Sequence, residues 1–207
     1  MILTLHDTPT ASEPTGTYGR ARRLREATHS THERLDAAIM AARPFESVQN
    51  YARFLKVQSG FHRDVAPLYQ DPALQQAFPG LAGRSRFAAV AADLNDIGLA
   101  IADDTTLPPA GEGMDLPEAL GWLYVVEGSN LGAAFLFKAA LKMGLSADHG
   151  ARHLAEAPEG RAASWRRFKE ALDAVALSKA EEARAIAGAE AAFQRVRSLV
   201  AAFLTPV

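Results

Sequence analysis

Two histidines, His29 and His32, lie three residues apart in a stretch with helical periodicity. At about 100° per residue, His32 falls at the edge of an apolar face and His29 falls closer to the polar face. The apolar face collects Leu24, Ala27, Thr28, Thr31, Leu35, Ala38 and Ile39. A neutral imidazole at such an edge can ligate a metal while a flat apolar ligand is buried beside it. The alternative is a histidine that simply marks the boundary of a buried face.

Arg25 precedes His32 by two helical turns and shares its side of the helix. A guanidinium there could pair with a carboxylate of a ligand held at the edge of the apolar face. His29 and His32 could instead form a metal-binding pair. The sequence shows no third ligand with matching geometry, which makes this second interpretation the weaker one.

Gly128 and Gly132 lie four residues apart in the long apolar stretch of the chain. Glycine inside a helix costs roughly 1 kcal/mol relative to alanine, so two on one face call for a reason. Together with Ala133 they leave a strip without side chains, where a flat ligand can approach the backbone. Tyr124 lies one turn earlier and would project near the same space. The alternative is close packing of this strip on another helix.

The same apolar stretch, residues 119–137, contains Glu127 as its only charge and could be mistaken for a membrane span. Glu127, Ser129 and Asn130 lie at its centre, where a charge costs roughly 2.5–3.5 kcal/mol in a bilayer. We therefore expect a buried central helix and no membrane partner.

Composition limits the remaining function classes. The 207 residues suit one large domain, and the formal net charge of −2 argues against a general nucleic-acid binder. The chain has no cysteine, which excludes disulfides, zinc–thiolate sites and a catalytic thiol, and agrees with a cytoplasmic protein. The N-terminus lacks the basic and apolar regions of a signal peptide.

Helical periodicity dominates the chain, and no convincing β-alternation is present. We expect an all-α single domain, 18–207, after a flexible N-terminal tail, 1–17. Ser47 and Asp115 are expected helix caps, and Pro67 should bend the end of the second helix. The expected helices are 17–42, 47–69, 84–101, 116–143, 161–176 and 179–204, with a short segment at 73–78 and a loop at 103–113.

Two segments together resemble the heme oxygenase family. Residues 24–35, LREATHSTHERL, contain the family's Leu-basic-x-x-Thr-x-x-x-His pattern, and residues 127–135, EGSNLGAAF, look like the glycine-rich distal helix of its bacterial, biliverdin-forming branch. Pro44-Phe45, the stretch 51–55 and the stretch 165–168 agree in order and spacing. The resemblance covers about Arg20 to Leu204 and implies the family's single-domain helical bundle.

The resemblance also implies an activity. Heme would be both substrate and cofactor, with His32 as the proximal iron ligand, and it would be opened to biliverdin, carbon monoxide and ferrous iron by dioxygen. Gly128, Ser129 and Gly132 would form the catalytic distal segment, and Tyr124 would lie beside the ligand. Arg25 is the best candidate for a propionate contact. Electrons would come from a ferredoxin or a reductase, because the chain shows no flavin, nucleotide or iron–sulfur motif.

Arg166 and Lys169 are further candidates for contacts with the propionates. The alternative for Arg166, Arg167 and Lys169 is a solvated helix face. In either case a monomer is the default expectation.

Ser129 departs from the mammalian branch of the family, which has an aspartate directly after the first distal glycine. Some bacterial members share the departure, so activity is still expected, but the proton route is left open. Two alternatives remain at this stage. One is a heme-binding or heme-delivery protein without turnover, and the other is an enzyme of the thiamine-salvage or quinone-cofactor type on the same bundle.

Overall fold

The computed structural model describes residues 19–99 and 113–204. Its described residues form α-helices and short 3-10 helices without a sheet, which confirms the all-α expectation. The tail expected at residues 1–17 lies outside the described residues. So do residues 103–112 of the expected loop and residues 205–207. The helices are α1 Arg20–Ala41, α2 Val48–Val65, η1 Ala66–Gln70, α3 Pro72–Ala77, η2 Leu81–Arg84, α4 Phe87–Asp96, α5 Leu116–Lys142, η3 Arg152–Leu154, α6 Arg161–Ala174 and α7 Lys179–Phe203.

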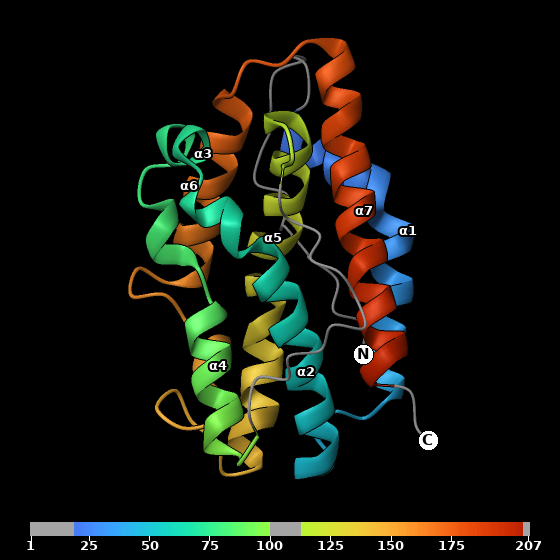
Figure 1. Ribbon diagram of the computed structural model, residues 1–207, viewed down its shortest axis with the longest axis vertical. Coiled ribbons are helices and arrows are strands. Elements are labelled where there is room, and N and C mark those ends of the chain that lie inside the picture. Colours follow the sequence, from blue (N-terminus) through green and yellow to red (C-terminus); the bar gives the residue numbers. More distant parts are fainter. Residues whose placement is uncertain (1–18, 100–112, 205–207) are drawn as a thin grey trace, which may run out of the picture.

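The helix α5 runs through the middle of the molecule, and the other helices pack around it (Figure 1). Its most extensive partner is α7, and α7 in turn carries α1. The helix α2 packs on α7 and α4, while α6 packs on α5 and on the start of α1. The helices α1 and α5 contact each other directly only to a small extent, because α7 links them.

Local sequence signals explain where these helices start. The side chains of Ser47 and Asp115 accept hydrogen bonds from the backbone N–H groups of Asn50 and Glu118, as both predicted caps require. Ser178 forms a complete capping box with Glu181 at the start of α7. These side chains satisfy backbone donors that the first helical turn leaves without a partner.

The boundaries of two helices, α2 and α4, differ most from the sequence expectation. The α-helical part of the second helix ends at Val65, and a 3-10 turn with Pro67 follows it, so the proline changes the helix type there. The helix expected over 84–101 is wrong at its start: residues 81–84 form a 3-10 turn and α4 begins only at Phe87. The helix α4 ends at Asp96, and Gly98 then takes a left-handed conformation with φ of +77°.

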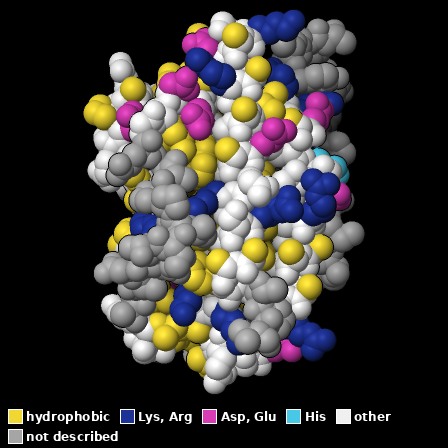
Figure 2. Space-filling view, turned by 45° about the vertical axis from the view of Figure 1, so that its right-hand side comes forward, with side chains coloured by type: hydrophobic (Ala, Val, Ile, Leu, Met, Phe, Trp, Pro, Cys, Tyr) yellow, Lys and Arg dark blue, Asp and Glu magenta, His cyan; other side chains and the backbone are white. Residues whose placement is uncertain are grey.

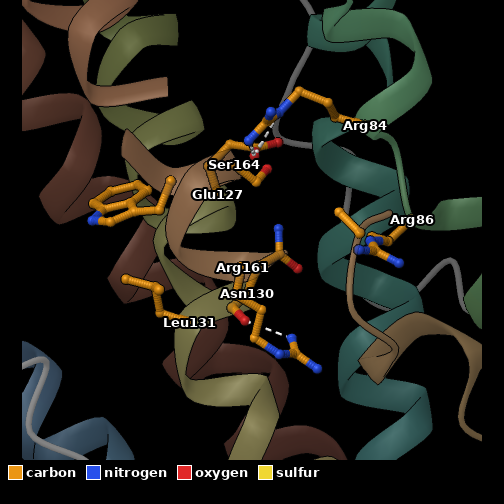
Figure 3. Close-up of a pocket in the computed structure, with 9 residues that line it drawn as sticks. Arg84, Arg86, Glu127, Asn130, Leu131, Arg161 and Ser164 are labelled. Atoms are coloured by element: carbon orange, nitrogen blue, oxygen red, sulfur yellow. Dashed lines mark hydrogen bonds and ion pairs between the residues drawn. The ribbon is translucent and has the colours of Figure 1, made fainter. Parts of the chain in front are cut away.

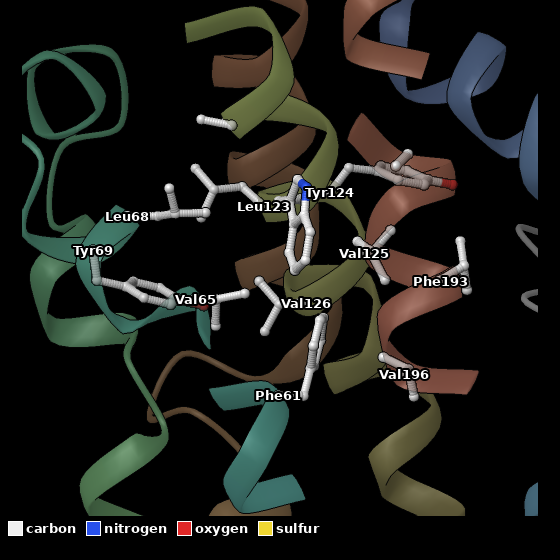
Figure 4. Close-up of a cluster of buried hydrophobic side chains, with 14 of the residues drawn as sticks. Phe61, Val65, Leu68, Tyr69, Leu123, Tyr124, Val125, Val126, Phe193 and Val196 are labelled. Atoms are coloured by element: carbon white, nitrogen blue, oxygen red, sulfur yellow. The ribbon is translucent and has the colours of Figure 1, made fainter. Parts of the chain in front are cut away.

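Apolar side chains of α5 form the centre of the core (Figure 4). Leu123 and Val126 are fully buried and pack with Val65 of α2 and with neighbouring apolar side chains. Trp122 stacks on Phe61 with ring centroids 6.2 Å apart. By length and composition α5 could cross a membrane, but half of its most apolar window is buried in the bundle. The helix therefore fits the expected role of a central core helix.

Gly121 of α5 and Gly188 of α7 lie where these two helices approach each other closely. A Cβ atom on Gly121 would meet backbone atoms of Ala185 and Ala189, and one on Gly188 would meet the backbone of Glu118, all closer than the 3.0 Å that Cβ atoms keep. These glycines let α5 and α7 pack backbone to backbone. The tight packing that the sequence left open for Gly128 thus occurs two turns earlier, at Gly121.

Buried charges anchor the start of α1. The Arg20 side chain, 3% exposed, forms an ion pair with Glu182 of α7 at 2.8 Å and donates to the carbonyls of Leu172 and Val175. Arg23 pairs with the same Glu182 carboxylate at 2.8 Å. The N-terminal part of α1 is thereby fixed to α6 and α7. On the face shown in Figure 2, basic side chains lie among acidic ones and do not form one continuous band.

Candidate functional site

His32 lies on α1 with 28% of its side chain exposed, at the boundary that the helical wheel predicted. Its Nδ1 atom is 3.6 Å from Oδ2 of Asp36, one turn later. Its ring meets Phe193 of α7 edge to face, with centroids 5.7 Å apart. Burial raises the pKa of Asp36, while the neighbouring His32 acts to lower it. The imidazole is thus held by an aromatic ring and a carboxylate, with Nδ1 as the nitrogen that faces the carboxylate.

The apolar face around His32 is only partly covered. Leu24, Thr28 and Leu35 are buried as expected, but Ala27 and Ala38 are exposed. The small side chains at these two positions leave part of the apolar face of α1 open. His29, with 57% of its side chain exposed, faces Glu33 at 3.5 Å. The described residues contain no group of three or more His, Asp or Glu side chains arranged to hold a metal ion.

Gly128 and Gly132 lie near the middle of α5 and are partly exposed. A Cβ atom on Gly128 would lie 3.5 Å from the Trp165 ring of α6, an ordinary contact, so close helix packing does not explain this glycine. Tyr124 is buried one turn earlier, and its ring lies 5.8 Å from that of Trp165. In Figure 4, Val125 lies on the side of α5 that faces α7, the helix that carries Phe193.

The polar residues between the two glycines have partners of their own. The Ser129 hydroxyl donates to the carbonyl of Val126 at 2.7 Å, and its side chain is exposed. The carbonyl of Asn130 accepts from Nη1 of Arg161 at 2.7 Å. Ser129 therefore has one hydrogen bond within the helix and lies at the surface of the ligand-free protein.

The basic residues expected to contact the propionates lie on two different helices. Arg25 is exposed on α1 seven residues before His32, and Arg166 is exposed on α6. Lys169 on α6 is half-buried. Arg167 forms an ion pair with Glu159 at 2.6 Å, which favours the solvated-face interpretation for that residue. None of these side chains contributes to the hollow described below.

A narrow hollow lies beside α5, between η2, the start of α4 and the start of α6 (Figure 3). Its polar lining includes three arginines, one buried carboxylate and small polar side chains: Arg84, Arg86, Arg161, Glu127, Asn130 and Ser164. Arg84 donates to Glu127 from Nε at 2.8 Å and from Nη2 at 2.5 Å. Burial lowers the pKa of Arg161, and nearby Arg86 adds to that effect.

Sequence reasoning missed two buried histidines and a buried carboxylate. Nδ1 of His153 lies 2.7 Å from Oδ2 of Asp93, and both side chains are buried. Burial lowers the pKa of His62 to about 3, helped by His153 and Arg86. Nδ1 of His62 and Nε2 of His153 are buried without a hydrogen-bond partner among the described residues. No spacing in the sequence links α2, α4 and η3, so only the three-dimensional arrangement reveals this cluster.

Fold and site together define a class of protein: an all-helical bundle with a partly exposed histidine on one helix and two partly exposed glycines in the central helix. The heme oxygenase family model matches residues 19–202. The chain therefore belongs to the heme oxygenase family. It is an enzyme of heme degradation, as the sequence motifs implied.

Individual relatives agree. The chain is 44% identical over 191 residues to heme oxygenase PigA of Pseudomonas aeruginosa, covering 92% of this chain and 96% of that protein. A heme oxygenase of Xanthomonas campestris is 35% identical over 125 residues, 59% of this chain and 72% of that protein. The crystal structure of the NO- and CO-bound heme oxygenase of Neisseria meningitidis is similar with a TM-score of 0.87 and 41% identity, covering 91% of this chain and 93% of the other. The heme oxygenase of Leptospira interrogans, at 16% identity and a TM-score of 0.67, shares the fold.

Proposed function

We propose that this heme oxygenase binds heme between α1 and α5, with Nε2 of His32 as the proximal iron ligand. The observation that carries the proposal is the setting of His32, whose side chain is 28% exposed on a helix face that is only partly covered, and whose Nδ1 is turned to Asp36 at 3.6 Å. A metal-bound histidine usually offers its other nitrogen to a carboxylate or a carbonyl, so this orientation leaves Nε2 for iron. The ring contact with Phe193 limits rotation of the imidazole.

The glycine segment of α5 forms the opposite wall of the proposed site. Gly128 and Gly132 have no side chain to keep a macrocycle away from the backbone, and a Cβ atom on Gly128 would be in ordinary contact with the Trp165 ring, at 3.5 Å. Tyr124 closes one side of this wall, and Ser129 offers a hydroxyl at its surface. Arg25, with Arg166 and Lys169 as further candidates, pairs with the propionates and so sets the rotation of the ring in its plane.

The substrate is heme, the co-substrate is dioxygen, and the products are biliverdin, carbon monoxide and ferrous iron. Bound heme supplies the iron that activates dioxygen, and the protein supplies orientation and a confined site. Electrons come from outside the chain, from a ferredoxin or a reductase. We further propose a monomeric, cytoplasmic protein whose catalytic domain spans 18–207 after a tail at 1–17, and the family match over 19–202 supports that boundary.

A pair of histidine variants tests the proposal. Hemin is added to the wild type, His32→Ala and His29→Ala, and the visible spectrum is followed before and after ascorbate or a ferredoxin system is added in air. The wild type and His29→Ala should show a histidine-ligated Soret band that decays to a bilin spectrum. His32→Ala should lose both the band and its decay. His29→Ala should keep them, because His29 lies on the same helix but is turned to solvent.

Each outcome of this experiment is informative. Equal loss in His29→Ala and His32→Ala would mean that helix damage, not iron ligation, causes the effect. Normal ligation and decay in His32→Ala would contradict the proposed ligand. A wild-type complex that binds hemin but never decays would contradict turnover by this chain.

A further inference from the structure

A buried ion-pair cluster holds α5 at the residue directly before Gly128. The side chain of Glu127 is 1% exposed and forms an ion pair with Arg84 at 2.5 Å. It also accepts a hydrogen bond from the Tyr69 hydroxyl at 2.9 Å. Burial, together with the charge of Glu127, raises the pKa of Tyr69 well above its usual value, so the phenol keeps the proton that it donates. The cluster ties α5 to η1 and η2.

A second attachment lies within the glycine segment itself. Arg161, the first residue of α6, donates from Nη1 to the carbonyl of Asn130 at 2.7 Å and from Nη2 to the carbonyl of Leu154 at 2.5 Å. Asn130 lies between Gly128 and Gly132. A helix with two glycines on one face lacks the side-chain packing that normally fixes a helix in place, so contacts from outside must fix its position.

The two attachments lie around the same hollow. Arg84, Glu127, Asn130 and Arg161 all line it, and Figure 3 shows the dashed contacts of Glu127 and Asn130 reaching across it to the two arginines. Burying a charge pair generally adds little net stability, because desolvation offsets the attraction. We therefore expect the buried pair of Arg84 and Glu127 to fix the position of α5 more than it stabilises the fold.

We infer that Glu127, with Tyr69 and Arg84, and Arg161, through the carbonyl of Asn130, form a distal brace that positions residues 128–132 over the substrate. These are positioning residues: they do not touch the substrate, but they fix the distance and tilt of the glycine segment that does. The inference rests on the proposed binding of heme between α1 and α5. It predicts that weakening the brace leaves ligation by His32 intact and loosens the control of where dioxygen attacks the ring.

The test compares Glu127→Gln and Tyr69→Phe with Asp64→Asn. Asp64 is an equally buried carboxylate that accepts a hydrogen bond from Nε of Arg195 at 2.6 Å, but this bond joins α2 to α7 and not to α5. All variants are loaded with hemin. The measurements are hemin affinity, the Soret band, the C–O stretching band of the ferrous carbon monoxide complex and the ratio of biliverdin isomers formed.

Glu127→Gln should keep the Soret band and bind hemin within about threefold of the wild type. It should broaden or shift the C–O band, yield more than one biliverdin isomer and lower the bilin formed per electron roughly tenfold, because small displacements at a reacting centre can cost up to about 100-fold. Tyr69→Phe should do the same to a smaller extent. Asp64→Asn should lower the unfolding midpoint yet keep the wild-type C–O band and isomer ratio.

The inference is overturned if Glu127→Gln and Tyr69→Phe keep the wild-type C–O band and isomer ratio. It is also overturned if Asp64→Asn changes both as much as they do, since general loosening would then explain the effect. If Glu127→Gln does not fold, Tyr69→Phe and Arg161→Gln decide by the same two readouts. Failure of the wild type itself to ligate hemin would refute the proposed function and is visible before any brace variant is measured.

Discussion

At the scale of single residues, two histidines of α1 with the same local geometry have different surroundings. His29 faces Glu33 and His32 faces Asp36, each one turn later, at 3.5 Å and 3.6 Å. More than half of the His29 side chain is exposed, whereas only about a quarter of the His32 side chain is. The His32 ring also lies against Phe193. Burial raises the pKa of Asp36, which reflects a drier environment in which its charge acts more strongly.

This difference predicts an unequal effect of two matched substitutions. A carboxylate at Nδ1 makes the imidazole a stronger donor to iron and favours ferric heme, so Asp36→Asn should raise the reduction potential of the bound heme. Turnover should fall roughly tenfold, at the lower end of the effect of ligand-orienting partners. Redox titration of the hemin complex measures the potential. Glu33→Gln is the control, and a rise of equal size in that variant would contradict the argument.

The sequence predicted the residues that could be placed on one helix, and missed those that depend on contacts between helices. The position of His32 follows from helical periodicity alone, as does the shared face of Gly128 and Gly132. Glu127 was interpreted only as a charge that argues against a membrane span. Its partners Tyr69 and Arg84 are 58 and 43 residues away in the chain, and no periodicity indicates that they meet.

At the scale of elements, the glycines of α5 fall into two functional groups. Gly121 faces the backbone of α7 with no room for a methyl group, whereas Gly128 faces the edge of the Trp165 ring at an ordinary contact distance. Helix ends were predictable because caps act within a few residues, as Ser47 and Asp115 do. The choice between packing and ligand binding for a glycine depends on what lies opposite, which the sequence does not contain.

Replacing these glycines by alanine should affect stability at some positions and activity at another. Gly121→Ala and Gly188→Ala should lower the free energy of unfolding by about 1 to 3 kcal/mol, because α5 and α7 must move apart. Gly128→Ala should leave the ligand-free protein as stable, or more stable by up to about 1 kcal/mol, because alanine favours the helix. It should nevertheless weaken hemin binding or turnover, since the methyl group enters the proposed site. Urea unfolding and hemin titration of the same variants measure both effects, and a stability loss in Gly128→Ala equal to that in Gly121→Ala would contradict the division.

At the scale of the whole molecule, buried ionisable groups determine how the fold responds to acid. Burial lowers the pKa of His62 to about 3, and it also lowers the pKa of His153 although the bond to Asp93 opposes the change. Hydrogen bonds to His153 and Arg152 lower the pKa of Asp93 despite its burial. The histidines are therefore neutral and the carboxylate charged in the native state near neutral pH, which fits the 2.7 Å contact between Asp93 and His153.

This charge state predicts a loss of stability in mild acid. An unfolded histidine takes up a proton near pH 6.5, whereas native His62 does so only near pH 3, so the unfolded chain binds more protons between these values. The contribution is complete above about pH 6.5 and decreases as the pH falls, by at most about 1.4 kcal/mol per pH unit for each buried histidine. Carboxylates with lowered pKa values, such as Asp93, add their own loss only below about pH 4, so the window from about pH 6.5 to about pH 5 isolates the histidines.

Urea unfolding from about pH 7.5 to about pH 5 tests this prediction. The wild type should lose stability steadily below about pH 6.5, and His62→Gln should show a flatter dependence, because the group that must be kept neutral is gone. His29→Gln should follow the wild type, since 57% of the His29 side chain is exposed to solvent. Parallel curves for the wild type and His62→Gln would show that His62 is not held neutral in the native protein, and the acid response would then have to come from His153 or from the carboxylates.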